Sequence, residues 1–171
     1  MGASAYGNLA NMSRWSNFQI WRGRLPHWRA DDVTYYVTFR HKRPLEDTER
    51  NTLLSKLLNT QGRKLDFVIL CVLPEKTEMM FTVMDSPRGE KYELSDVIEK
   101  AKTKAGKEII KKSEERWPPF YFESYDRIIR DDEEYESTFL SILESPVNEE
   151  LCDDPEEWFD LFVADAPQPA Q

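Results

Sequence analysis

Two apolar runs separated by a short charged turn constrain the fold of this chain more than any other feature. Residues 65–73 read LDFVILCVL and residues 79–83 read MMFTV, with the charged stretch 74–78 (PEKTE) between them. A nearly continuous apolar run is typical of a central strand that is covered on both faces. The second run is predicted to be its antiparallel partner across the turn.

The remaining elements follow from periodicity. Residues 33–40 alternate and are rich in β-branched and aromatic side chains, which predicts a strand, and residues 120–129 predict a further one. A helix is predicted after Pro44, with its buried stripe formed by Leu53, Leu54, Leu57 and Leu58. A long amphipathic helix is predicted at 93–115, and a last helix from about residue 131 to residue 144, before Pro146.

The element order β-α-β-β-α-β-α predicts an α+β fold of ferredoxin-like layout, with one antiparallel sheet and helices packed mainly on one face. A length of 171 residues suits a single domain. We expect a flexible lead-in at 1–19, one α+β domain at 20–162, and a disordered tail rich in Pro, Ala and Gln at 163–171. The two cysteines indicate reduced thiols and a cytoplasmic location. No apolar stretch is long enough to span a membrane, so we expect no membrane as a partner.

The net charge of −9 is unevenly distributed. Residues 117–171 carry two Lys or Arg against sixteen Asp or Glu, whereas residues 1–43 carry seven against two and residues 91–116 eight against six. The average charge therefore does not exclude a nucleic-acid partner for residues 1–43 and 91–116. The acidic C-terminal segment is interpreted as a flank whose aromatic residues pack on the domain, or as the docking site of a protein partner.

Two groups of residues are candidates for DNA binding. One interleaves cations with aromatic rings, as in single-stranded or hairpin DNA recognition, and the other is a lysine stripe on the outer face of the long helix. The candidates are Arg22, Arg24, Trp28, Arg40, Lys42 and Arg43 in the first group, and Lys100, Lys104, Lys107 and Lys111 in the second. The alternatives are core tryptophans with surface arginines, and an ordinary solvated helix face.

Several segments, taken in order and spacing, resemble the single-tyrosine HUH transposases, in particular the REP-associated tyrosine transposase branch. They are RGRLPHW (22–28), TYYVTFR (34–40), VLPEKTE (72–78), LSDVIEKAKTKAGKEI (94–109), ESYDRIIRDDEEYE (123–136), ILESPV (142–147) and DDPEEW (153–158). The resemblance implies a metal-binding His-x-His pair on a central strand, a nucleophilic tyrosine on the last helix, and a metal-binding Asn one turn later. It also implies recognition of hairpin DNA.

None of these catalytic residues is present at the matching positions. Lys76 and Glu78 stand where the resemblance places the two histidines, Ser141 replaces the tyrosine, and Ser145 replaces the Asn. An ammonium has no lone pair for a metal, and an unassisted serine hydroxyl is a poor nucleophile. Tyr135 and Tyr125 are both poorly placed to substitute for the nucleophile.

The leading hypothesis is therefore a transposase-like, DNA-binding pseudoenzyme that requires no cofactor and is nucleoid-associated through its DNA. One alternative is an active nuclease or transposase that uses Glu75 and Glu78 to bind Mg²⁺ or Mn²⁺. Another is a protein-interaction module on the same scaffold. The sequence leaves open whether the protein is a monomer or a homodimer.

Overall fold

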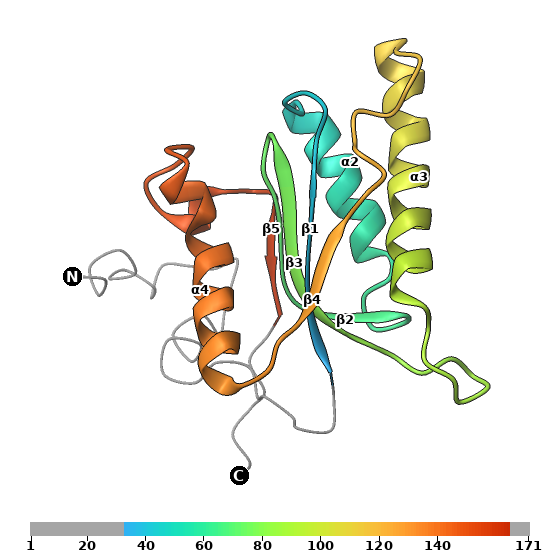
Figure 1. The fold of residues 1–171 in the computed structure, drawn as a ribbon. Helices are drawn as coiled ribbons and strands as arrows, with labels where there is room; N and C mark the ends of the chain where they lie inside the picture. Colours follow the sequence, from blue (N-terminus) through green and yellow to red (C-terminus); the bar gives the residue numbers. More distant parts are fainter. Residues whose placement is uncertain (1–32, 165–171) are drawn as a thin grey trace.

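The computed structural model describes residues 33–164, which form a five-stranded antiparallel sheet between two layers of helices (Figure 1). The strands are β1 (Thr34–Arg40), β2 (Leu65–Val72), β3 (Lys76–Val83), β4 (Tyr125–Ile128) and β5 (Leu161–Val163), in the order β4-β1-β3-β2-β5. The helices are α2 (Asp47–Leu58), α3 (Leu94–Ser113), α4 (Asp132–Asn148) and the short 3-10 helix η3 (Pro155–Glu157). The predicted α+β class and β-α-β-β-α-β-α order are confirmed.

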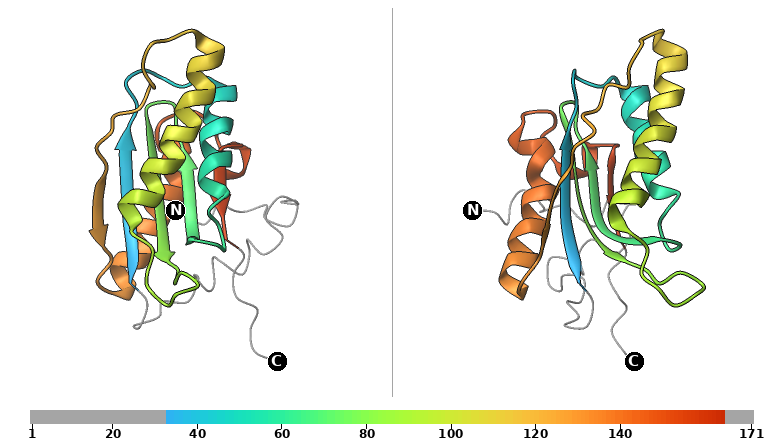
Figure 2. Two further views of the ribbon diagram at one scale, coloured as in Figure 1. Left: turned by 90° about the vertical axis from the view of Figure 1, so that its right-hand side faces the viewer. Right: turned by 45° about the vertical axis from the view of Figure 1, so that its right-hand side comes forward.

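The two helical layers are unequal. Helices α2 and α3 lie side by side on one face of the sheet, which accounts for the predicted packing mainly on one face (Figure 2). Helix α4 covers the opposite face (Figure 1). No helix within residues 33–164 combines the length and apolar character that a membrane span requires.

The β2–β3 hairpin is the centre of the sheet, as predicted. Its register pairs Leu65 with Val83 and Val72 with Thr77. Side chains on the hairpin alternate between two cores: Cys71 and Met80 face α4, whereas Leu70 and Met79 face α2 and α3. Because both faces are covered, most positions of the two strands are buried and only Asp66 is exposed, which explains the continuous apolar runs.

The core under α2 and α3 is built from residues at helical spacing. Leu53 and Leu57 of α2 and Ala101 and Ile109 of α3 contribute buried side chains to it. The observed bounds of α3, Leu94–Ser113, lie within two residues of the predicted 93–115. These helices thus follow from their local patterns alone.

The predicted end of the last helix near residue 144 is wrong, because α4 continues to Asn148 with Pro146 inside it. A proline in the last turn removes only one backbone N–H donor from the helix. Pro146 is buried, as are Ile142 and Leu143 earlier in the helix. Its burial offsets the lost hydrogen bond, and Ser145 remains within the helix.

The predicted strand at 120–129 is also too long, because regular pairing with β1 is limited to Tyr125–Ile128. Earlier in the segment only an isolated bridge between Phe120 and His41 forms. The ammonium of Lys102 on α3 donates hydrogen bonds to the carbonyl oxygens of Tyr121 and Phe122, at 2.6 and 3.0 Å. These carbonyls are directed toward α3 and are lost to the sheet.

The acidic C-terminal segment packs on the domain as far as it is described. Trp158 Nε1 donates to the Val72 carbonyl at 2.9 Å, and β5 then pairs with β2 through Ile69 and Val163. This edge strand is absent from the sequence prediction and ends at Val163, one residue beyond the expected domain boundary. Burial of Leu161 and Val163 under α4 explains why so short a strand forms.

Candidate functional site

The residues that stand at the matching catalytic positions are brought together from two elements. Lys76 and Glu78 lie at the start of β3, and their side chains share the sheet face with Met80, which α4 covers. Ser145 lies in the last turn of α4 and is buried, like Glu78. Residues 67 positions apart in sequence thus meet at one point, and the sequence alone did not fix that contact.

The three side chains form one polar network. The Ser145 hydroxyl donates to Glu78 Oε2 at 2.9 Å, and Lys76 Nζ lies 3.1 Å from Glu78 Oε1. The same ammonium lies 3.4 Å from Glu149 Oε1, just beyond the end of α4. Burial alone would lower the pKa of Lys76, but the carboxylates of Glu78 and Glu149 outweigh it and hold this pKa above its usual value.

The network does not fit a divalent metal. Both oxygens of the Glu78 carboxylate already contact donors, and one of those donors is a cation that repels another cation. Glu75 is exposed in the turn before β3, whereas Glu78 is buried within the strand. Within residues 33–164 no group of three or more His, Cys, Asp or Glu side chains is placed to hold a metal ion.

The hydroxyl and phenol groups considered as nucleophiles are not gathered at the network. Ser141 is exposed one helical turn before Ser145, and its carbonyl oxygen lies 2.8 Å from Ser145 Oγ. The single hydroxyl proton of Ser145 is therefore shared between this carbonyl and Glu78 Oε2. Tyr135 is buried in the core under α4, and this burial raises the pKa of its phenol. Tyr125 lies on the edge strand β4, opposite Thr38 of β1. Within residues 33–164, neither the Ser141 hydroxyl nor the Tyr125 phenol hydrogen-bonds to Lys76 or Glu78.

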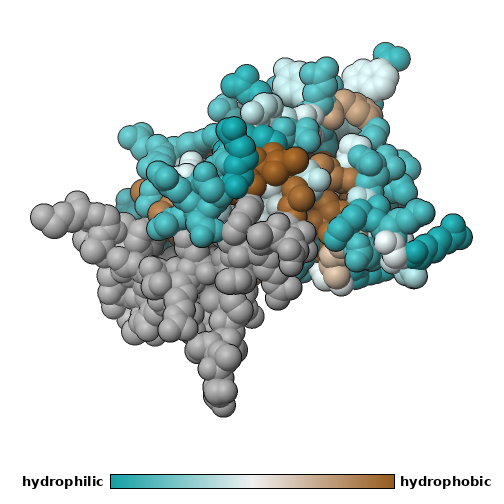
Figure 3. Space-filling view, turned by 60° about the horizontal axis from the view of Figure 1, so that its bottom comes forward, coloured by the Kyte–Doolittle hydropathy of each residue, from teal (hydrophilic) through white to brown (hydrophobic). Residues whose placement is uncertain are grey.

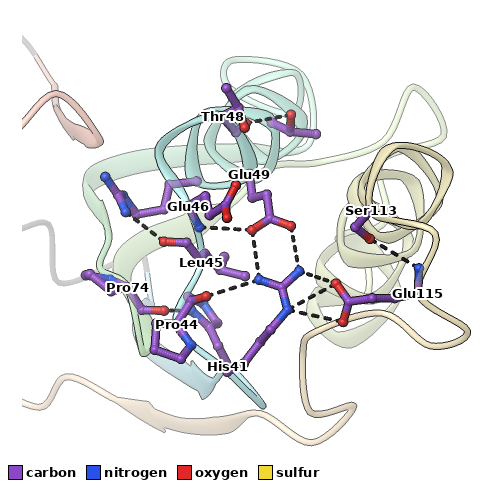
Figure 4. Close-up of polar contacts among 12 residues, drawn as sticks. His41, Pro44, Leu45, Glu46, Thr48, Glu49, Pro74, Ser113 and Glu115 are labelled. Carbon is purple, nitrogen blue, oxygen red and sulfur yellow. Dashed lines mark hydrogen bonds and ion pairs between the residues drawn. The ribbon is translucent and has the colours of Figure 1, made fainter.

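His41, which the sequence did not single out, lies on the other side of β3 from Glu78. Its Nδ1 is 2.8 Å from the Pro74 carbonyl, to which it donates (Figure 4). Nε2 of the neutral imidazole therefore accepts from the Thr77 hydroxyl at 2.9 Å. Burial lowers the pKa of His41 to about 4. A neutral, fully hydrogen-bonded imidazole serves here to fix the turn that precedes Lys76.

The Arg43 side chain is fully engaged in contacts within the domain. Its guanidinium donates to Glu49 of α2 at 2.8 and 2.6 Å and to Glu115 beyond α3, with Nε at 3.0 Å (Figure 4). A further contact to the Pro44 carbonyl engages the last of its five N–H groups. This predicted DNA-binding residue therefore has no donor left for a phosphate and instead ties α2 to the end of α3.

The other predicted DNA-binding residues divide into two groups by position. Arg40 and Lys42 are exposed at the end of β1, and the lysine stripe (Lys100, Lys104, Lys107 and Lys111) is exposed along α3. Helix α3 itself lies on the outer side of the molecule (Figure 2). Arg22, Arg24 and Trp28 lie outside the described residues. The sequence pattern thus located an exposed basic face but did not reveal the ion pairs of Arg43.

The end of the sheet where β1 begins carries apolar surface in a hollow surrounded by hydrophilic side chains (Figure 3). A pocket of about 270 Å³ lies there, lined in part by Val33, Tyr35, Val83 and Leu94. It is at the opposite end of β3 from Glu78. No residue predicted to belong to a site lines it.

Comparisons with known proteins identify the fold. No protein-family model and no curated protein matches the sequence. Among solved structures, the chain is similar to a REP-associated tyrosine transposase bound to a REP hairpin, with a TM-score of 0.59, 15% identity, and coverage of 78% of this chain and 79% of that one. A putative transposase from Deinococcus radiodurans R1 matches with a TM-score of 0.45 and 13% identity, over 71% of this chain and 96% of that one. The first similarity shows a transposase-like fold.

Proposed function

We propose that this protein is a DNA-binding protein on a transposase-like fold and that it does not cleave DNA. The observation that carries this proposal is the contact of Lys76 and Ser145 with the two oxygens of Glu78. In the transposases that the sequence resembles, the positions of Lys76, Glu78 and Ser145 carry the metal ligands. Here a tethered ammonium supplies the positive charge, and it cannot activate a nucleophile or polarise a phosphate as a metal does.

DNA as the partner is supported by two observations. The structural neighbour with a TM-score of 0.59 is bound to a REP hairpin. In this chain the lysine stripe leaves four cations exposed on one helix, in a protein whose net charge is −9. The net negative charge disfavours phosphate contacts at surfaces without exposed cations such as these. Binding of this kind would associate the protein with the nucleoid.

Fluorescence anisotropy with labelled hairpins that carry single-stranded tails tests the proposal. We expect binding at about 50 mM salt that weakens steeply as salt rises. Lys104→Glu/Lys107→Glu/Lys111→Glu should weaken binding at least tenfold, and loss of three phosphate contacts should reduce the slope of log K against log salt by roughly 2–3. Arg63→Glu/Arg88→Glu/Lys91→Glu, with the same change in charge on exposed residues away from the stripe, is the matched control.

Absence of binding to every hairpin and single strand at low salt would overturn the proposal. The cleavage part has its own readout, because a denaturing gel separates a covalent protein–DNA adduct from free protein. We expect no adduct with Mg²⁺ or Mn²⁺. An adduct that disappears in Glu78→Gln would establish the alternative, an active nuclease with altered ligands.

A further inference from the structure

The segment between α3 and β4 exposes an unusual number of aromatic rings. Trp117, Tyr121 and Phe122 are 64%, 50% and 72% exposed, and Tyr125 follows on β4. These four account for nearly half of the nine exposed large hydrophobic side chains in residues 33–164. Folding does not explain them, since exposed rings gain no burial, so they point to a binding surface. We call Trp117, Tyr121 and Phe122 the aromatic platform.

A pocket opens beside this platform. It has a volume of about 200 Å³ and lies between α3 and the segment 118–122. Its walls are mainly apolar, with Ile110, Pro118 and Phe120 among the lining residues, and Lys107 and Glu99 contribute charged groups. Sites for drug-sized ligands are about 300–1,000 Å³, so this smaller pocket suits one flat ring.

The backbone of the platform is fixed although its rings are exposed. Lys102 Nζ donates to the carbonyls of Tyr121 and Phe122, and Tyr121 N donates to the Arg40 carbonyl at 3.1 Å. Gly106 lets the segment approach α3 closely, because a Cβ there would lie 3.0 Å from the Pro118 side chain. A platform held in this way loses little conformational entropy when it binds a ligand.

Cations are interleaved with the rings. Lys42 Nζ lies 5.8 Å from the centre of the Tyr121 ring, and the Arg116 guanidinium lies 5.3 Å from that of Trp117. Lys107 lines the pocket and also belongs to the lysine stripe, so the pocket adjoins a row of exposed ammonium groups. Exposed aromatic rings beside a basic track match the way proteins bind single-stranded nucleic acid, with bases stacked on rings and phosphates held by cations.

We propose that the aromatic platform binds the single-stranded part of a DNA target and that one unpaired base enters the adjoining pocket. This inference rests on the proposed function and assigns it a location. The lysine stripe would contact phosphates of any DNA. The platform would require unpaired bases, because the bases of a duplex are already stacked on one another.

Two hairpins with the same stem test the inference, one blunt and one carrying a ten-nucleotide thymidine tail. We expect the tail to increase the affinity of the wild-type protein. Tyr121→Ala/Phe122→Ala should weaken binding of the tailed hairpin at least fivefold, the low end of base–aromatic stacking, and leave binding of the blunt hairpin unchanged. Tyr121→Phe/Phe122→Tyr, which keeps both rings, should bind as the wild type does. Phe159→Ala is the matched control, because it removes a ring that is 80% exposed but lies outside the segment between α3 and β4.

Photocrosslinking with 5-iodouracil in the tail gives an independent readout. We expect the crosslink on the tryptic peptide 117–127, which contains the whole platform. If the platform variants bind the tailed hairpin like the wild type, or if the crosslink maps elsewhere, the inference is wrong while the proposed function stands. If the wild type binds neither hairpin, both are wrong.

Discussion

The hydroxyl of Ser145 lies 2.9 Å from Glu78 Oε2 and joins the last turn of α4 to the first residues of β3. Together with Lys76, which approaches the other carboxylate oxygen, it leaves Glu78 buried but fully contacted. A buried carboxylate is costly unless it has such partners. The network therefore stabilises the position that the resemblance assigns to metal chemistry.

Ser145→Ala should destabilise the protein by about 1.5–3 kcal/mol, because it removes a buried hydrogen bond to a charged group. Ser141→Ala, one turn earlier on an exposed position, should change stability by less than about 0.5 kcal/mol. Urea unfolding of both variants measures the two values. Equal effects of the two substitutions would show that the Ser145–Glu78 contact contributes nothing to stability.

The variant Lys76→His/Glu78→His/Ser141→Tyr/Ser145→Asn should acquire metal binding and some strand cleavage. It removes the ammonium and its carboxylate partner and places two imidazoles on the sheet face that α4 covers. Calorimetric titration with Mn²⁺ measures the first property, and a covalent adduct with single-stranded DNA measures the second.

The same variant without Ser141→Tyr is the control, and it should bind metal without forming an adduct. A folded quadruple variant that binds no metal would contradict the alignment of Lys76 and Glu78 with the histidine pair.

Asp160→Ala should cost about 3–5 kcal/mol, because it leaves the buried Arg50 without its buried partner. Arg50 Nε donates to Asp160 Oδ2 at 2.9 Å, and the guanidinium lies 4.8 Å from the centre of the Trp158 ring. Asp47 pairs with the same arginine from an exposed position, so Asp47→Ala should cost less than about 1 kcal/mol.

Hydrogen exchange gives a second readout of the Asp160 contact. In Asp160→Ala the amides of β5 should lose protection before those of β2, because Arg50 and Trp158 hold the C-terminal segment against the domain. Unchanged protection in β5 would assign its order to the burial of Leu161 and Val163 alone.

Local pattern predicted some elements of this fold and failed for others for identifiable reasons. The β2–β3 hairpin follows from its apolar runs because burial on both faces leaves a direct trace in the sequence. The extension of α4 through Pro146 and the addition of β5 depend on contacts with distant residues, which periodicity does not report. The same holds for Arg43, which reads as a free cation in sequence but is paired with Glu49, six residues away, and Glu115, 72 residues away.

The candidate site was predictable in part. The resemblance located Lys76, Glu78 and Ser145 on two elements, and the structure shows that these elements meet. The resemblance did not indicate that Lys76 pairs with the Glu78 carboxylate, nor that His41 fixes the turn before β3. The platform was missed because Tyr121 and Phe122 fall within the predicted strand and Trp117 was assigned to no element, and only their exposure distinguishes them.

Acid should weaken the protein through His41 between about pH 6.5 and pH 4. Burial lowers the folded-state pKa of His41 to about 4, against about 6.5 when unfolded, so the unfolded chain binds more protons in this range. The contribution, about 3 kcal/mol, is fully present above pH 6.5 and is lost as the pH falls toward 4. Urea unfolding from pH 7 to pH 4 measures it, and His41→Gln should lose correspondingly less stability over that range, while the carboxylate contributions remain in both proteins. In a His27→Gln background His41 is the only imidazole, so its pKa can be read directly by NMR. A measured value near 6.5 would show that the imidazole is not held neutral between Pro74 and Thr77.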